Sequence, residues 1–173
     1  MADATKVSGI TNPRRILALE IRSQRFAFVA LEGMNVIDFG IRRCRSHSGS
    51  VQAVTLKRFV PVVDFCVPTA AVIRKRLGKS SQDPGTMQAI TKAIRAQCRR
   101  RAIQVYGMSE KKVQSFFAKY GATTKHATAS LLAEWFEELA WKLPPKRKPW
   151  QSERPNTLLF DALAVAMAFL GAE

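Results

Sequence analysis

The chain begins with three short apolar segments that are separated by polar turns. These segments are ILALEI at 16–21, FAFVAL at 26–31 and VIDFGI at 36–41, and Glu32 and Gly33 lie in the second gap. Short gaps with turn-forming residues between β-branched and aromatic runs are typical of consecutive antiparallel strands. Because the first two runs are apolar almost throughout, we expect helices to cover both of their faces.

After these segments, helical and strand-like patterns alternate to the end of the chain. Ser48 and Ser50 predict the start of a helix that ends near Phe59, because serine side chains cap helix N-termini. A fourth strand is expected at 60–67, followed by a basic loop at 68–85. The later expected elements are helices at about 86–101, 109–120, 125–139 and 155–170 and a fifth strand at 102–106.

This order of elements predicts the fold class. Three consecutive strands followed by alternating helices and strands indicate an α/β domain with a mixed five-stranded sheet and helices on both faces. The length of 173 residues suits one domain with a hydrophobic core and is short for two. We therefore expect a flexible N-terminal tail at 1–14 and a single domain at 15–171.

The chain is strongly basic. It carries 28 lysines and arginines against 13 acidic residues, so its formal net charge is +15. A charge this far from zero favours a polyanionic partner, above all a nucleic acid, although a ribosomal or merely basic protein is an alternative. Clustered basic side chains hold phosphates and carry little sequence information. The clusters that we expect to bind nucleic acid comprise Arg74, Lys75, Arg76 and Lys79, and Lys146, Arg147 and Lys148.

Other features indicate a cytoplasmic protein. The N-terminal segment shows no apolar run of signal-peptide length. The apolar stretch at 157–171 is interrupted by Asp161 and is too short to cross a bilayer. The cysteines lie far apart without a CxxC motif, which indicates small buried residues in a reducing compartment, with no zinc site or disulfide framework. They are Cys44, Cys66 and Cys98.

Two acidic residues lie within apolar segments. The last predicted helix is apolar on all sides around Asp161, and Glu20 lies in the first apolar strand. An isolated buried carboxylate is costly or takes up a proton, so each of them needs a partner. If the last helix packs beside the first strand, the two carboxylates converge and can hold Mg²⁺ between them. The alternative is that each is a structural residue paired with an arginine or with the backbone.

Two segments near the ends of the chain carry a family resemblance. ILALEIRSQRFAFVALEG looks like the opening hairpin of the RuvC-type Holliday-junction resolvases, and PPKRKPWQSERPNTLLFDALAVAMAFL looks like their C-terminal segment. The resemblance runs from about Arg15 to Leu170. It implies an RNase H-like fold and a Mg²⁺-dependent (or Mn²⁺-dependent) endonuclease that cleaves branched DNA, such as four-way junctions, by two-metal hydrolysis. It also implies a homodimer, since such junctions are two-fold symmetric.

The resemblance also assigns roles, with departures from the family pattern. It makes Glu20 and Asp161 metal ligands, although the family has Asp at the first position, and it makes Glu153 an additional nearby acid. The family has a Glu near the end of the fourth strand, where this chain offers only Asp64, about three residues too early. An odd offset turns a side chain to the opposite sheet face, so Asp64 is either a displaced catalytic acid or a structural residue. Arg154 stands where the family has another acid.

These departures leave three functions open. The first is the structure-selective endonuclease, which would use all four of these acids. The second is an RNase H-like module without catalysis that binds DNA or RNA through the same basic residues. The third is a subunit whose basic surface docks nucleic acid within a larger complex.

Aromatic residues near the C-terminus have two interpretations each. Trp150 follows the second basic cluster, where it can stack on an exposed base or cover the core. In the predicted helix at 125–139, apolar residues recur at helical spacing and indicate either core packing or a dimer face. They are Leu131, Leu132, Trp135, Phe136 and Leu139.

Overall fold

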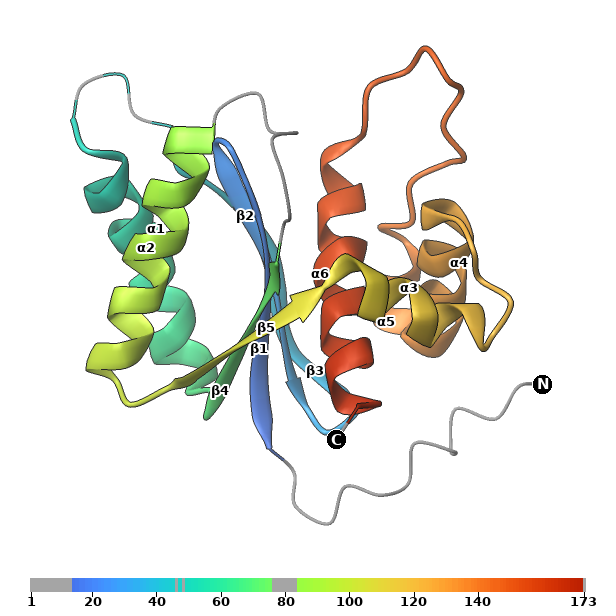
Figure 1. Ribbon diagram of the computed structural model, residues 1–173, viewed down its shortest axis with the longest axis horizontal. Helices are drawn as coiled ribbons and strands as arrows, with labels where there is room; N and C mark the ends of the chain where they lie inside the picture. Colours follow the sequence, from blue (N-terminus) through green and yellow to red (C-terminus); the bar gives the residue numbers. More distant parts are fainter. Residues whose placement is uncertain (1–13, 46, 48, 76–83, 173) are drawn as a thin grey trace.

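The computed structural model describes residues 14–172 except 46, 48 and 76–83. In this part of the chain, five strands form one sheet that lies between two layers of helices (Figure 1). The strands are β1 (Arg15–Arg22), β2 (Arg25–Glu32), β3 (Asn35–Arg43), β4 (Ala70–Lys75) and β5 (Gln104–Ser109). The helices are α1 (Val51–Cys66), α2 (Pro84–Arg100), α3 (Glu110–Ala118), α4 (Lys125–Trp135), α5 (Glu137–Ala140) and α6 (Pro155–Leu170).

The sheet is mixed, with the strand order β3-β2-β1-β4-β5. The first three strands pair antiparallel, whereas β4 and β5 run parallel to β1. Side chains alternate between the two faces of a strand. Ile16 and Ala18 therefore pack in one core cluster, and Leu17 and Leu19 pack in the other. This arrangement confirms the predicted α/β class with a mixed five-stranded sheet.

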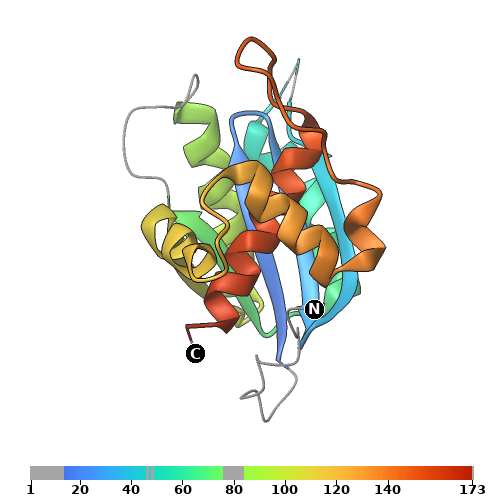
Figure 2. The ribbon, with the colours of Figure 1, turned by 90° about the vertical axis from the view of Figure 1, so that its right-hand side faces the viewer.

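The two helical layers explain why β1 and β2 are apolar on both faces. Helices α1 and α2 cover one face, and α3 to α6 cover the other (Figure 1). All residues of β1 and β2 except those at the ends are buried. In the side view, α6 runs across the sheet with α4 on its outer side (Figure 2). Both faces of these strands are buried, so neither face carries a row of polar side chains. The prediction that helices cover both faces of the first two strands is confirmed.

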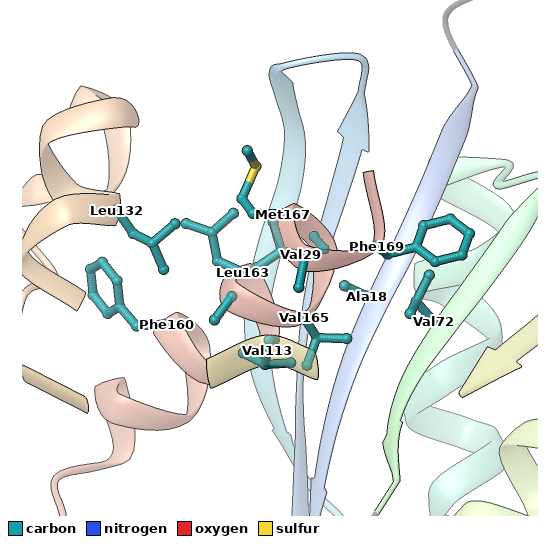
Figure 3. Packing of buried hydrophobic residues seen from close by; sticks show 14 of the residues in the cluster. Ala18, Val29, Val72, Val113, Leu132, Phe160, Leu163, Val165, Met167 and Phe169 are labelled. Atoms are coloured by element: carbon teal, nitrogen blue, oxygen red, sulfur yellow. The ribbon is translucent and has the colours of Figure 1, made fainter. Parts of the chain in front are cut away.

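Helix α6 lies at the centre of the larger core cluster. Its residues from Leu158 to Leu170 are buried without a break. Leu163 and Val165 lie among side chains from the sheet and from α3 and α4 (Figure 3). This burial on all sides was predicted, and the bounds of α6 match the prediction. Asp161 is thereby held in an apolar helix that packs directly on β1 and β2.

The predicted fourth strand at 60–67 was wrong. These residues belong mainly to α1, which continues through Pro61 to Cys66, and β4 lies later at Ala70–Lys75. Residues Phe59, Val62, Val63 and Cys66 are buried at helical spacing against the sheet. Burial of this face outweighs the strand preference of valine, which is a weak and context-dependent signal.

Smaller differences have local causes. The strand β5 begins two residues later than predicted, because Ala102 adopts a left-handed conformation and the Ile103 N–H bonds to the Cys98 carbonyl at the end of α2. The predicted helix at 125–139 breaks at Phe136, whose backbone is not helical, into α4 and α5. The predicted cap at Ser50 is confirmed, since its hydroxyl accepts the Ala53 N–H bond, and Ser109 caps α3 in the same way.

Several predictions about the core are also confirmed. The apolar stripe of α4 and α5 packs into the larger core cluster, and the three cysteines are buried and unpaired. Burial raises the pKa of Cys66 and of Cys98 to about 11. Among the described helices, none has the length and apolar character that a membrane span needs. Most of the predicted tail, together with Arg76 and Lys79 of the first basic cluster, lies outside the described residues.

Candidate functional site

The sheet places three charged side chains on the face covered by α6. Glu20 and Arg22 on β1 follow the alternation of Ile16 and Ala18, which face this layer. Leu19 pairs with Ile73 in the parallel ladder between β1 and β4, so Glu20 lies beside Arg74 near the carboxyl ends of both strands. Crevices at the carboxyl ends of parallel strands are common ligand sites in α/β folds.

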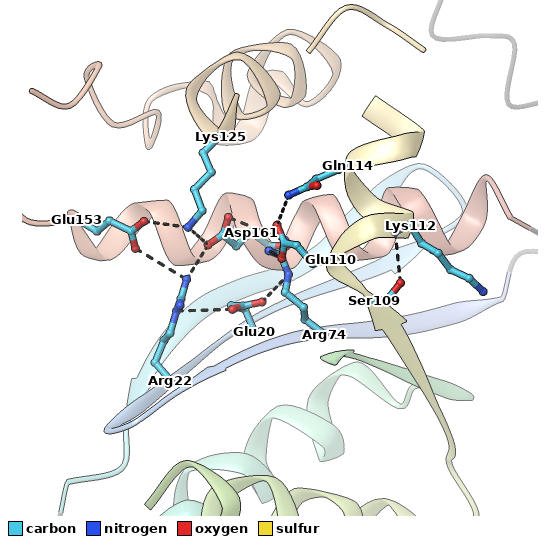
Figure 4. A network of polar contacts seen from close by, with 10 residues as sticks. All are labelled: Glu20, Arg22, Arg74, Ser109, Glu110, Lys112, Gln114, Lys125, Glu153 and Asp161. Atoms are coloured by element: carbon cyan, nitrogen blue, oxygen red, sulfur yellow. Dashed lines mark hydrogen bonds and ion pairs between the residues drawn. The ribbon is translucent and has the colours of Figure 1, made fainter. Parts of the chain in front are cut away.

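Arg74 lies among three carboxylic residues. Its Nε is 3.0 Å from Glu20 Oε2, and its Nη1 donates to Glu110 Oε2 at 2.6 Å (Figure 4). Its Nη2 donates to the backbone carbonyl of Asp161 at 3.3 Å and lies 4.0 Å from Asp161 Oδ1. The side chains of Arg74 and Glu20 are 4% and 0% exposed. The guanidinium therefore joins β1, α3 and α6 in the interior.

Arg22 and Lys125 complete the ion pairs on the outer side. Arg22 Nη2 donates to Asp161 Oδ2 at 3.1 Å, and Arg22 Nε lies 3.6 Å from Glu20 Oε1. Lys125 Nζ lies 3.5 Å from Asp161 Oδ2 and donates to Glu153 Oε1 at 2.9 Å. The structure thus brings Glu20, Asp161 and Glu153 into one network, with cations between them (Figure 4).

The pKa of Glu153 reflects this surrounding charge. Partial burial by itself raises the pKa, but the hydrogen bond and the charge of Lys125 act in the opposite direction. The positive charges of Arg22 and Arg147 lower the pKa further, so that it lies below its ordinary value of 4.5. Glu153 is therefore ionised at neutral pH.

We call this network the carboxylate–cation cluster. Its members are Glu20, Glu110, Glu153, Asp161, Arg22, Arg74 and Lys125. Four carboxylates face three cations, and two of the carboxylates, Glu20 and Asp161, are buried. A buried charge is tolerated only when it is paired and hydrogen-bonded. The arginine pairing that the sequence left open as an alternative is the arrangement found: Asp161 accepts a hydrogen bond from Arg22, and Glu20 is ion-paired with Arg74 and Arg22.

The donor set does not fit Mg²⁺ between Glu20 and Asp161. Mg²⁺ requires carboxylate oxygens and waters around it in octahedral geometry. Here, guanidinium groups that keep their charge in proteins lie against oxygens of both carboxylates. Within the described residues, no group of three or more His, Cys, Asp or Glu side chains is arranged to hold a metal ion.

Asp64 lies apart from the cluster. It is on α1, in the helical layer on the opposite face of the sheet, and it pairs with Arg101 near the protein surface. The expectation that Asp64 is a fourth-strand residue was wrong, because that strand starts at Ala70. At the end of the real fourth strand, the side chain next to Glu20 is Arg74. A cation thus occupies the part of the strand where the family resemblance led us to expect an acid.

Four members of the cluster were not predicted in these roles from the sequence. Arg74 was assigned to a basic loop that binds phosphate, whereas it is buried at the end of β4. Arg22, Glu110 and Lys125 were not selected at all. Arg22 carried a usable signal, since it follows Glu20 by two residues and must therefore face the same side of the strand. Glu110 and Lys125 are the first residues of α3 and α4 and carry no such signal.

A pocket of about 380 Å³ adjoins the cluster between α3, α4 and α6. Arg74, Lys125 and Asp161 form part of its polar wall, and Phe117 and Phe160 contribute to its apolar wall. This volume lies within the usual range of small-ligand pockets. Lys125, the first residue of α4, is half-exposed where it borders this pocket, whereas Asp161 is buried.

The described residues of the two predicted basic clusters lie in two places, at the end of β4 and on the loop before α6. Lys75 is exposed at the end of β4, with its alkyl chain against Gly107 of β5, and it is not in the cluster. Lys146, Arg147 and Lys148 are exposed on the loop that leads into α6. Trp150 on the same loop is 78% exposed, so the interpretation that it covers the core was wrong. The loop beside the cluster is therefore basic and carries an exposed aromatic side chain.

Known proteins resemble this chain in structure but do not match it in sequence. No protein-family model matches the chain, and no curated protein matches it. Solved structures do match. The RuvC of Thermus thermophilus in complex with a Holliday junction substrate aligns with a TM-score of 0.69 and 12% identity, covering 91% of this chain and 93% of that chain.

Two further resolvase structures align over most of this chain. The yeast mitochondrial Holliday junction resolvase has a TM-score of 0.64 and 12% identity, with 96% of this chain and 84% of that chain covered. The fowlpox virus resolvase, solved with Holliday junction DNA, has a TM-score of 0.57 and 8% identity, with 91% and 99% covered. At these identities the likeness concerns the fold, and it confirms the fold that the two end segments predicted.

Proposed function

Starting from the RuvC-type resolvase fold of this chain, we propose that the protein is a nucleic-acid-binding module that binds branched DNA without a metal centre. The observation that carries the proposal is the position of Arg74, which ion-pairs with Glu20 and contacts Asp161 inside the protein. The carboxylates that would hold ions in a nuclease are here occupied by guanidinium groups and a lysine. Their role in this proposal is to hold β1, β4, α3 and α6 together.

The binding itself is assigned to the basic loop beside the cluster. Lys146, Arg147 and Lys148 are exposed there, and the protein as a whole carries a net charge of +15. Prolines on both sides of these residues limit the conformational entropy that the loop loses on binding. Contacts of this type are made to phosphates, so we expect affinity to depend steeply on salt. Recognition of a branched shape, in this proposal, comes from the resolvase fold.

A second candidate is the Mg²⁺-dependent or Mn²⁺-dependent junction endonuclease. One observation favours it: Glu20 near the end of β1, Glu153 on the loop before α6 and Asp161 in the first half of α6 do lie close together. Two of the three cations are partly exposed, Arg22 at 26% and Lys125 at 50%. For this candidate, those side chains must turn away when DNA and metal bind, and Arg74 must leave Glu20.

One experiment separates the two candidates. The purified protein is incubated with a four-way junction and a matched duplex, in EDTA, Mg²⁺ or Mn²⁺, and both binding and cleavage are measured. We expect junction binding in EDTA and no cleavage in any buffer. Cleavage that disappears in Asp161→Asn would establish the endonuclease and contradict the proposed function.

A charge-matched pair of variants tests the basic loop. Lys146→Ala with Lys148→Ala removes two charges from the loop, and Arg99→Ala with Arg100→Ala removes two from the end of α2, in the opposite helical layer. We expect the loop variant to lower the slope of log affinity against log salt by about 1.8 and the α2 variant to change it little. Equal effects of the two variants would indicate generic polyanion binding, without a defined surface.

A further inference from the structure

The loop between α5 and α6 carries a tryptophan, Trp150, that does not pack in either core cluster. Trp150 is 78% exposed, although most large aromatic side chains of the described chain lie in the core. An indole that is mostly exposed contributes little to the hydrophobic stabilisation of the domain. Tryptophan in this position is typical of a contact surface for a partner.

The loop backbone holds Trp150 in a defined place. Residues 148–151 form a turn in which the Gln151 N–H donates to the Lys148 carbonyl at 3.0 Å. The Lys148 N–H donates to Gln151 Oε1 at 3.1 Å, which closes the turn a second time. Pro149 occupies the second position of this turn, where its fixed φ is favourable. Trp150 therefore stands at the tip of an ordered turn.

The base of this loop is fixed to the rest of the molecule. Asn156 Nδ2 donates to the Lys142 carbonyl at 3.2 Å, which ties the start of the loop to the start of α6. Glu153 is bound to Lys125 of the carboxylate–cation cluster. The position of Trp150 relative to the cluster is thereby set by contacts at both ends of the loop.

The concave side of the loop is cationic. A pocket of about 410 Å³ is lined by Trp150, Arg147, Arg154 and Pro145, among others. Lys148 Nζ lies 5.5 Å from the centroid of the indole ring. An aromatic face beside two guanidinium groups matches the chemistry of a nucleotide, in which a flat base is joined to a phosphate.

We propose that the turn at 148–151 and this pocket form a stacking site for an unpaired base of DNA. The base stacks on Trp150, and Arg147 and Arg154 bind the phosphates on either side of it. This inference rests on the proposed DNA-binding function and specifies its substrate: DNA that exposes unpaired bases, as at a branch point or in a single strand. Duplex DNA, whose bases are already stacked and paired, does not fill the site.

Trp141 provides a matched control within the same chain. It is 72% exposed and also has a lysine, Lys142, 4.1 Å from its ring centroid. Its indole N–H already donates to the Glu138 carbonyl at 3.0 Å, and it does not line the cationic pocket. Each variant removes an exposed indole and changes no charge, so Trp141→Ala controls for the general loss of a surface tryptophan.

The test is a tryptophan fluorescence titration of the full chain with oligo(dT) and, in parallel, with four-way junction and duplex DNA. We expect oligo(dT) and the junction to quench the fluorescence of the wild type and of Trp141→Ala. In Trp150→Ala we expect that quenching to be lost and the affinity for oligo(dT) to fall roughly tenfold, as for one stacked base. Trp150→Phe retains an aromatic face and should recover most of that affinity.

The proposed phosphate contacts of Arg147 and Arg154 are tested separately, by the salt dependence of oligo(dT) binding. Replacing Arg147 and Arg154 by alanine should lower the salt slope for oligo(dT) by about 1.4, since single strands release about 0.7 counterion per neutralised phosphate. Junction binding that is unchanged in Trp150→Ala would overturn the stacking site and leave the proposed function intact. Absence of junction binding in the wild type would instead contradict the proposed function. A change of oligomeric state in Trp150→Ala, with DNA affinity unchanged, would mean that this surface binds a second copy of the chain.

Discussion

Arg74 Nε lies 3.0 Å from Glu20 Oε2, and this ion pair joins two neighbouring parallel strands inside the protein. The two side chains are 4% and 0% exposed, so neither charge is solvated by bulk water. The same guanidinium contacts Glu110 at the start of α3 and Asp161 in α6. One cation thus connects four elements around the place where a metal-dependent nuclease would need an anionic centre.

Replacing Arg74 by methionine should destabilise the protein strongly. The substitution keeps a similar length but leaves the carboxylate of Glu20 buried without this partner. Breaking a buried ion pair in this way costs about 3–5 kcal/mol. The free energy of unfolding, measured by urea denaturation followed by circular dichroism, checks the value.

The control for this prediction is the surface pair on the other side of the sheet. Arg101 pairs with Asp64, and these side chains are 33% and 55% exposed. Exposed pairs contribute at most about 1 kcal/mol, so Arg101→Ala should cost little. If Arg74→Met cost no more than Arg101→Ala, the buried pair would have no special role in stability.

Replacing both partners should restore much of the loss. The double variant Glu20→Met with Arg74→Met contains no unpaired charge at this position, because an apolar pair replaces the ion pair. Such exchanges are often neutral or stabilising in other proteins. We therefore expect the double variant to unfold at a higher urea concentration than Arg74→Met alone. A double variant less stable than both single variants would contradict the pairing.

Removing Arg74 should also create affinity for Mg²⁺. In the wild type we expect no rise in melting temperature with Mg²⁺ beyond that caused by the same ionic strength of NaCl. Arg74→Ala leaves four carboxylates facing two cations, so an ion that binds the folded state should stabilise it in a concentration-dependent way. Adding Asp161→Asn to this variant should abolish the gain. A Mg²⁺-dependent rise in the wild type would favour the endonuclease.

The lowered pKa of Glu153 predicts a change of stability at acidic pH. A carboxylate whose pKa is lower in the folded state stabilises that state above the unfolded pKa and loses this effect as the pH falls through the folded pKa. Glu153→Gln should therefore be less stable than the wild type near neutral pH and equally stable at strongly acidic pH. The side chain is 41% exposed, so we expect a difference below about 1 kcal/mol.

Denaturation of both proteins at several pH values between about 3 and 7 measures this difference. A suitable control is Glu137→Gln, which removes an exposed carboxylate of α5 that is not in the cluster. The prediction fails if the difference in free energy of unfolding between Glu153→Gln and the wild type is the same at every pH.

The buried cysteines should be unreactive in the folded protein. Burial raises the pKa of Cys66 and of Cys98 to about 11, so few thiolates are present near neutral pH. At ~pH 8 we expect Ellman's reagent to label the native protein slowly. In urea we expect it to label all three thiols rapidly. Rapid stoichiometric labelling without urea would show that the layer formed by α1 and α2 opens readily.

Local pattern was sufficient for much of the fold. The apolar runs at β1 and β2 required cover on both faces, and the apolar helix α6 required burial on all sides, because side-chain periodicity reports burial directly. The strand wrongly predicted at 60–67 shows that the periodicity of a short apolar run does not distinguish a strand from a helix. A run such as VPVVDFCV fits a buried strand or one face of a buried helix, and only packing against the sheet selects between them.

The sequence alone determined that Glu20 and Asp161 are buried and need partners, since neither lies on a polar face of its element. Which partners they have was decided by the tertiary structure. Arg74 reaches Glu20 because β4 pairs in parallel with β1, and Arg22 and Lys125 reach Asp161 because α4 and α6 pack on that face of the sheet. These contacts join residues far apart in the chain, and their geometry depends on strand register and helix packing, which no local pattern specifies.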